Sequence, residues 1–136
     1  MKRFVLVFLA VVLPIYVLPL QAADETAAVD AAIYIPLQPA FVVNYGGTGR
    51  LRYLKAEISV RVTDSEAANA VRHHMPLIRN NLVMLFSSQS EELINSQDGR
   101  EQLRQNALGV IREVVMQEDG MEGVIDVYFN TFIVQN

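Results

Sequence analysis

The sequence has 136 residues, 51% of them apolar, enough for one domain with a single core beside an N-terminal segment. It contains no cysteine, so disulfides and thiolate chemistry are excluded, and a metal ion would find only His73, His74 and carboxylates as ligands. The formal net charge of −4 argues against nucleic-acid binding, because contacts to phosphates need clustered lysine and arginine side chains.

Residues 1–22 have the pattern of an export signal. Two basic residues, Lys2 and Arg3, precede the apolar run 4–20, and small residues follow that run. The same run is just long enough to act instead as a membrane anchor, and its two prolines favour a cleaved signal without excluding a span. In either case the two basic residues stay inside and the rest of the chain is exported.

Residues 23–32 are small and acidic and are interpreted as a linker, and the exported domain is predicted to span 33–136. Its first segment, 33–45, is predicted to be extended, with two prolines that restrict the first half to a sheet edge or an irregular approach. The glycine-rich segment 46–49 is predicted to form the turn of an antiparallel hairpin with a second strand, 51–62. Alternate apolar residues of the second strand should face the core: Leu54, Ala56, Ile58, Val60 and Val62.

The second half of the domain is predicted to be mainly helical. A helical stretch is expected over 64–88, with a kink or a restart at Pro76. One short helical turn is expected within 89–97, then a long amphipathic helix over about 98–118, and a last strand over 124–134. The predicted fold class is α+β: a small, largely antiparallel sheet of three main strands with helices on one face, in the order strand, strand, helix, helix, helix, strand.

Alternation along the last strand assigns its side chains to two faces. One face is expected to carry Ile125, Val127, Phe129 and Ile133. The other face is expected to carry an apolar stripe of Tyr128, Phe132 and Val134. An uncovered apolar stripe indicates a protein interface, unless the first strand or the linker covers it. Tyr128 and Phe132 are therefore candidate protein-interaction residues.

Arg72 and Arg79 are two further candidate protein-interaction residues. They are seven positions apart, which is two helical turns, so they are expected to project from one helical face. Arginine is enriched at protein interfaces, and this face would suit an acidic partner surface. The alternative is an ordinary solvated helix face.

The reactive residue types of this sequence do not form a catalytic or cofactor-binding motif. Adjacent residues on a helix diverge by about a hundred degrees, so His73 and His74 cannot easily share a metal ion. The serines of 87–90 lack a nucleophile motif, and 46–49 lacks the lysine and the following helix of a phosphate loop. The sequence therefore predicts no catalytic, cofactor or metal site and no enzymatic activity.

Five parts of the exported domain carry a family resemblance: Leu37–Asn44, Arg52–Lys55, Pro76–Asn80 with Leu85–Ser87, Gly99–Arg104 and Val124–Gln135. In this order, over about residues 35–135, they resemble the FliL family of flagellar basal-body-associated proteins. The resemblance implies an inner-membrane protein with its domain on the periplasmic side, or a soluble periplasmic protein if 1–22 is cleaved. It also implies association with stator units and other basal-body proteins, in support of torque, swimming, swarming and chemotaxis.

The same resemblance implies a stomatin-like (SPFH-like) fold and self-assembly into a homo-oligomeric ring or arc. The residues alone leave an alternative function open. This is a periplasmic or membrane-edge binding module for a lipid or another small ligand, with its cleft between the sheet and the helices.

Overall fold

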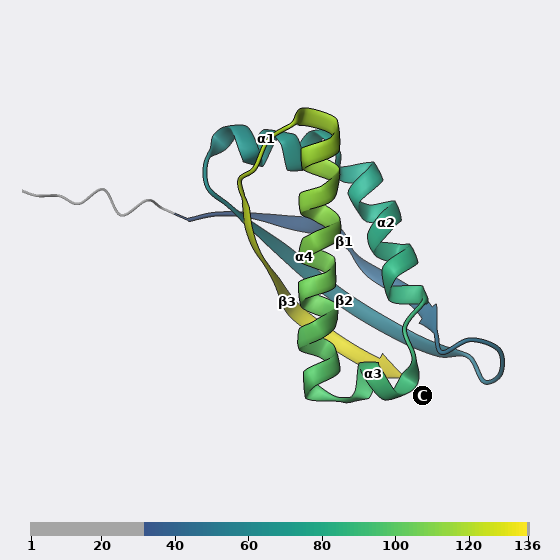
Figure 1. Cartoon of the computed structure of the whole chain (residues 1–136). Coiled ribbons are helices and arrows are strands. Elements are labelled where there is room, and N and C mark those ends of the chain that lie inside the picture. Colours follow the sequence, from purple (N-terminus) through teal and green to yellow (C-terminus); the bar gives the residue numbers. More distant parts are fainter. Residues whose placement is uncertain (1–31, 136) are drawn as a thin grey trace, which may run out of the picture.

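The computed structural model describes residues 32–135, so the predictions for 1–22 and for nearly all of the linker lie outside the described residues. Within this range, three strands form one antiparallel sheet, and α2 and α4 of four helices lie over one face of it (Figure 1). The elements in chain order are β1 (Ile33–Tyr45), β2 (Arg52–Val62), α1 (Ser65–His73), α2 (Met75–Ser87), α3 (Glu91–Asn95), α4 (Gln97–Asp119) and β3 (Val124–Gln135). This is the predicted α+β architecture.

β2 is the centre of the sheet, because both other strands pair with it in the order β1-β2-β3. Its alternating sequence makes one face apolar, and that face lies beneath the helices. The five predicted core residues are confirmed as buried: Leu54, Ala56, Ile58, Val60 and Val62. They share one core with apolar side chains from every helix of the described domain, among them Val71, Ile78, Phe86, Ile94, Leu103 and Ile111.

β1 is an edge strand, as its prolines predicted. Its pairing with β2 is interrupted between Leu37 and Phe41, in the stretch that contains the cis Gln38–Pro39 peptide bond. Proline cannot donate to a strand ladder, so such an irregularity is tolerated at a sheet edge. Buried and exposed residues of β1 still alternate on either side of it, which keeps one face of β1 in the core.

β3 contains two bulges relative to β2. One lies at Asn130 and the other at Ile125, where the register against β2 shifts. An extra residue in one strand is left unpaired and reverses the inward and outward alternation beyond it. The bulges therefore decide which side chains of β3 reach the core.

The predicted faces of the last strand are wrong outside the stretch between these bulges. Phe132 and Val134 were expected to share an outer stripe with Tyr128, but both pair with inward-facing residues of β2 and pack against the core. Ile133 was expected to share a face with Val127 and Phe129, but it pairs with the outward-facing Lys55 and is 47% exposed. Between the bulges the predicted alternation is confirmed.

The central helical stretch consists of two helices, so the predicted three helices become four. Asp64 begins α1, because its Oδ1 accepts a hydrogen bond of 2.9 Å from the backbone N–H of Ala67, and this bond lowers the pKa of the Asp64 carboxyl. α1 ends at His73 and α2 begins at Met75, with Pro76 in its first turn. A proline in the first turn removes no helical hydrogen bond, because the N–H groups there have no partner within the helix. The predicted restart of the helix is confirmed.

The boundaries of α4 follow from its caps. Ser96 Oγ accepts a hydrogen bond of 3.0 Å from the N–H of Gly99, so the helix begins at Gln97, slightly earlier than predicted. It ends at Asp119, and Gly120 follows with a φ of 64°. This left-handed conformation suits glycine and is the helix end predicted from the sequence.

Replacement of Ile58 by aspartate is expected to unfold the domain. Ile58 is 1% exposed at the middle of β2. An unpaired buried carboxylate costs several kcal/mol, which is a large part of a total stability of about 5–15 kcal/mol. The matched control is Val42→Asp, because Val42 is 64% exposed on the opposite face of the sheet. Thermal unfolding followed by circular dichroism measures both, and a native-like melting temperature for Ile58→Asp would contradict the assigned core face.

Candidate interaction surfaces

The two arginines predicted as partner contacts lie on different helices. Arg72 is exposed on α1 and donates a hydrogen bond of 3.3 Å to Asn69 Oδ1 of the same helix. Arg79 on α2 donates a hydrogen bond of 3.2 Å to Leu37 O, and its guanidinium lies 4.2 Å from the centre of the Phe41 ring. The expectation that both project from one helical face is wrong, because the helical phase is broken between α1 and α2. Arg79 therefore links α2 to β1 through these two contacts. Arg72 remains exposed at the surface.

The face of the sheet turned away from the helices is uncovered within residues 32–135, and we call it the outer face. Its side chains include Val42 and Ile133, which are 64% and 47% exposed and flank Lys55 of β2. Near the other end of the strands, the rings of Tyr34 and Tyr128 lie 5.9 Å apart between their centres. The outer face thus combines exposed apolar side chains with charged ones, a composition that suits protein contacts.

Phe132 does not belong to the outer face. Its ring centre lies 5.2 Å from that of Phe129, and the guanidinium carbon of Arg100 lies 5.1 Å from it. Of the two aromatic residues predicted as contacts, Tyr128 lies on the outer face and Phe132 packs against the core. The bulge at Asn130 causes this separation.

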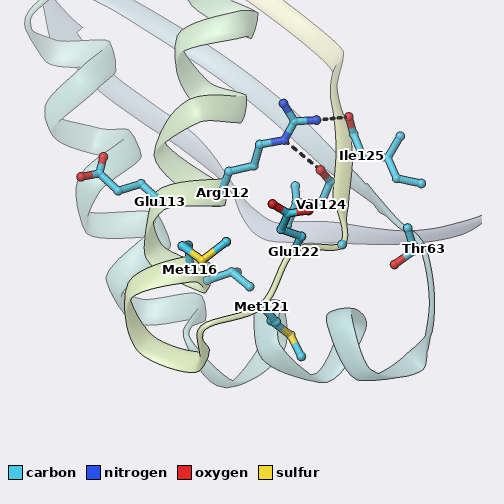
Figure 2. Close-up of a pocket in the computed structure, with 10 residues that line it drawn as sticks. Thr63, Arg112, Glu113, Met116, Met121, Glu122, Val124 and Ile125 are labelled. Atoms are coloured by element: carbon cyan, nitrogen blue, oxygen red, sulfur yellow. Dashed lines mark hydrogen bonds between the residues drawn. The ribbon is translucent and has the colours of Figure 1, made fainter.

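A groove that the sequence did not reveal lies between the second half of α4, the loop 120–123 and the start of β3 (Figure 2). Its volume is about 670 Å³. Its apolar lining includes Val115, Met116, Met121 and Val124, and its carboxylates are Glu113 and Glu122. We call it the acidic groove. In the sequence these residues belong to a helix end and a loop, and only the fold brings them together.

Arg112 forms part of the wall of the acidic groove and holds the start of β3 in place (Figure 2). Its Nε donates a hydrogen bond of 2.9 Å to Val124 O, and its Nη2 donates one of 2.9 Å to Ile125 O. These carbonyls lie at the second bulge, where the strand ladder is disrupted. The guanidinium is thus directed at the strand backbone.

A second hollow adjoins the acidic groove, and Met121 lines both. The second hollow also contains Glu66, His73 and Asp119. Asp119 Oδ2 lies 3.0 Å from Nε2 of His74, a residue 45 positions away, and this pair ties the junction of α1 and α2 to the end of α4. Sequence spacing showed no carboxylate partner for either histidine, because this contact depends on the tertiary fold.

A polar network joins α4 to β3. Arg104 makes hydrogen bonds of 2.8 and 2.5 Å to the two carboxylate oxygens of Glu101, contacts the carboxylate of Asp126, and donates to Val127 O at 3.2 Å. Hydrogen bonds from Arg104 and Gln105 hold the pKa of Glu101 at about 2, well below its ordinary value. The neighbouring carboxylates raise the pKa of Arg104, so both groups stay charged at neutral pH.

The described residues offer little that could hold a metal ion. Within residues 32–135, no three histidine, aspartate or glutamate side chains gather in an arrangement that could bind one. The rings of His73 and His74 lie 4.8 Å apart in a T-shaped arrangement, and His74 is engaged with Asp119. This part of the chain also contains no helix long and apolar enough to cross a bilayer.

The family of this chain follows from a match over nearly the whole described domain. The family model for flagellar basal body-associated protein FliL matches residues 34–135. The chain belongs to the FliL family. It is 28% identical over 113 residues to the flagellar protein FliL of Aquifex aeolicus (strain VF5), across 83% of this chain and 68% of that relative. It is 25% identical over 117 residues to the flagellar protein FliL of Escherichia coli (strain K12), across 84% of this chain and 74% of that relative.

FliL membership confirms the resemblance found in the sequence and makes this chain a flagellar basal body-associated protein. The stomatin-like fold, the position at the membrane and the stator association stay predictions. The candidate surfaces of this FliL domain are the outer face, the acidic groove and the exposed Arg72, whereas Arg79 and Phe132 are engaged in packing.

Replacement of Arg79 by alanine is expected to destabilise the FliL domain by about 1–2 kcal/mol, through loss of the contact with the Phe41 ring and of the hydrogen bond to Leu37 O. The matched variant Arg72→Ala should change stability by less than about 0.5 kcal/mol, because its side chain is exposed. Urea unfolding of both variants measures the difference. Equal effects would mean that Arg79 is merely solvated.

Replacement of Glu101 by glutamine is expected to lower stability at neutral pH but not near pH 2. A carboxylate whose pKa is lowered by folding stabilises the fold above its unfolded pKa of about 4.5, and this contribution is lost as the pH falls towards about 2. The difference in melting temperature between wild type and Glu101→Gln should therefore shrink across that interval. Glu118→Gln, at an exposed carboxylate of the same helix, is the control. A difference that did not depend on pH would exclude the Glu101 carboxylate as its source.

Proposed function

We propose that this chain is a non-enzymatic accessory component of the flagellar motor. In this proposal the segment 1–22 exports it, as an anchor or as a cleaved signal, and the FliL domain works on the periplasmic side of the inner membrane. There it supports stator units, and through them swimming, swarming and chemotaxis. Membership of a basal body-associated family is the main support for this proposal.

The outer face of the sheet supports a role that depends on contact with other proteins. A protein that acts by contact needs a surface whose apolar side chains remain available after folding. The outer face offers Val42 and Ile133, both largely exposed, and the Tyr34–Tyr128 pair. We propose that stator or other basal-body proteins meet this face, with Tyr128 within the contact. Arg72, exposed on the helical side, is a candidate for a second, weaker contact.

We also propose that the domain assembles with copies of itself into a ring or an arc. A single domain of this size offers a small contact area, whereas several copies around a stator would add their contacts. This proposal requires surfaces for neighbouring copies that are separate from the surface for the partner.

The alternative of a lipid- or ligand-binding module has less support. It requires a cleft between the sheet and the helices. In the described domain that space is occupied by buried side chains, among them Phe41, Phe86, Ile58 and Leu103. The acidic groove lies at the rim of the domain and carries two carboxylates, which does not suit an anionic lipid.

The double variant Val42→Glu, Ile133→Glu is expected to impair motility while leaving the fold intact. The new carboxylates flank Lys55 on β2, so cross-strand attraction offsets the loss of apolar surface in the monomer. At an interface the same two charges would be buried and would weaken the contact. Swimming on soft agar measures function, and circular dichroism measures folding.

The matched control is Met84→Glu, because Met84 is 65% exposed on α2, away from the outer face. It should swim like wild type. Normal swimming of the double variant would overturn the outer face as the partner surface. Equal impairment of Met84→Glu would move the partner surface to the helical side.

A further inference from the structure

The loop between β1 and β2 projects from one end of the domain, at the lower right of Figure 1. We call residues 46–52 the hairpin tip. Its Leu51 is 65% exposed and lies between Arg50 and Arg52. One exposed leucine is ordinary. An exposed leucine next to the exposed Arg50, on a projecting loop, suits insertion into an apolar, acidic recess.

The base of the hairpin tip is fixed to the body of the domain. The N–H of Gly46 donates a hydrogen bond of 3.2 Å to Gln89 O, and Arg52 forms an ion pair of 2.8 Å with Glu91. These two contacts set the direction in which the tip projects. Leu51 and Arg50 remain available beyond them, because both are exposed.

The acidic groove at the other end of the domain has the matching chemistry. Methionine side chains adapt to the shape of a partner, and Met116 and Met121 line the recess. Glu113 and Glu122 belong to the groove, and Glu66 and Asp119 lie in the hollow that adjoins it. The one arginine of the groove, Arg112, is directed at the backbone of β3. The recess therefore favours an apolar side chain that arrives beside a positive charge.

We propose that the hairpin tip of one copy occupies the acidic groove of the next copy. Leu51 packs against Met116 and Met121, and Arg50 lies beside Glu122. This inference rests on the self-assembly proposed above and names the two surfaces that would perform it.

The positions of these surfaces fix the kind of assembly. β2 leads from the hairpin tip to Thr63, which lines the groove, and its 11 residues span about 36 Å. The tip therefore cannot reach the groove of its own copy. A contact between two different patches is head-to-tail, so each copy uses one tip and one groove, and the chain of copies closes into a ring where the rotation allows. The outer face takes no part in this contact and stays available to a partner.

The absence of cysteine from the whole sequence gives a direct test. The full-length double variant Leu51→Cys, Met121→Cys is produced in motile cells, the intact cells are oxidised, and their proteins are separated on a non-reducing gel. We expect a ladder of covalent dimers, trimers and larger species. Leu51→Cys alone and Met121→Cys alone should give no species larger than a dimer, because one thiol per chain can form only one disulfide.

The matched control pairs Leu51→Cys with Met84→Cys, another exposed methionine, which lies on α2. A ladder with Met121→Cys but not with Met84→Cys supports the proposal. No ladder, or equal ladders, overturns it. The molar mass of the purified wild type, measured by light scattering, separates the two proposals. If the wild type forms oligomers and the cysteine pair gives no ladder, the hairpin contact is overturned while self-assembly stands. A monomeric wild type overturns both.

Charge exchange provides a second test that does not depend on thiols. In the same light-scattering measurement, Arg50→Glu and Glu122→Arg should each lower the yield of oligomers by about tenfold, because each places like charges together. A mixture of the two variants should restore the yield, since each hairpin tip then meets a groove of opposite charge. Both substitutions are at exposed positions, so circular dichroism should show an unchanged fold. Failure of the mixture to recover would overturn the Arg50–Glu122 pairing.

Discussion

The burial of one face of β2 is the constraint on which the rest of the domain depends. Its alternate residues are apolar from Leu54 to Val62, and a strand of this kind is stable only when another layer removes that face from water. The chain after β2 supplies this layer with the four helices of the described domain, and the last strand then returns beside β2. Because the helices cover only one face, the other face stays exposed and becomes available for contacts.

α4 both covers the sheet and compensates for the irregular backbone of β3. The bulges of β3 interrupt its ladder with β2, and backbone carbonyls at such places need other donors. Arg112 donates to the carbonyls of Val124 and Ile125, and Arg104 donates to that of Val127. The same bulges place Phe132 and Val134 in the core and Ile133 outside. Side chains of one helix thus stabilise the irregular strand that determines the outer face.

The local features of the fold were predictable, whereas those that depend on register or on distant contacts were not. The alternation of β2 and the glycine after α4 have distinct sequence signals. The bulge at Asn130 has none, because apolar residues lie on both sides of it and either face assignment fits. The break between α1 and α2 was expected, but a break does not reveal its angle, so the placement of Arg79 against β1 was missed. The acidic groove is formed by α4, the loop 120–123 and the start of β3. The hydrophobic periodicity of each element does not indicate which elements lie side by side.

The positions of the candidate surfaces explain how a small domain could serve several contacts at once. A long β-strand keeps surfaces apart in two ways. Its ends lie tens of ångströms from each other, and its two faces point in opposite directions. In this domain the hairpin tip and the acidic groove lie at opposite ends of β2, and the outer face lies between them. Copies joined end to end would therefore present their outer faces as a continuous surface. The contact between copies would then not compete with the contact to a partner, because the two use different surfaces.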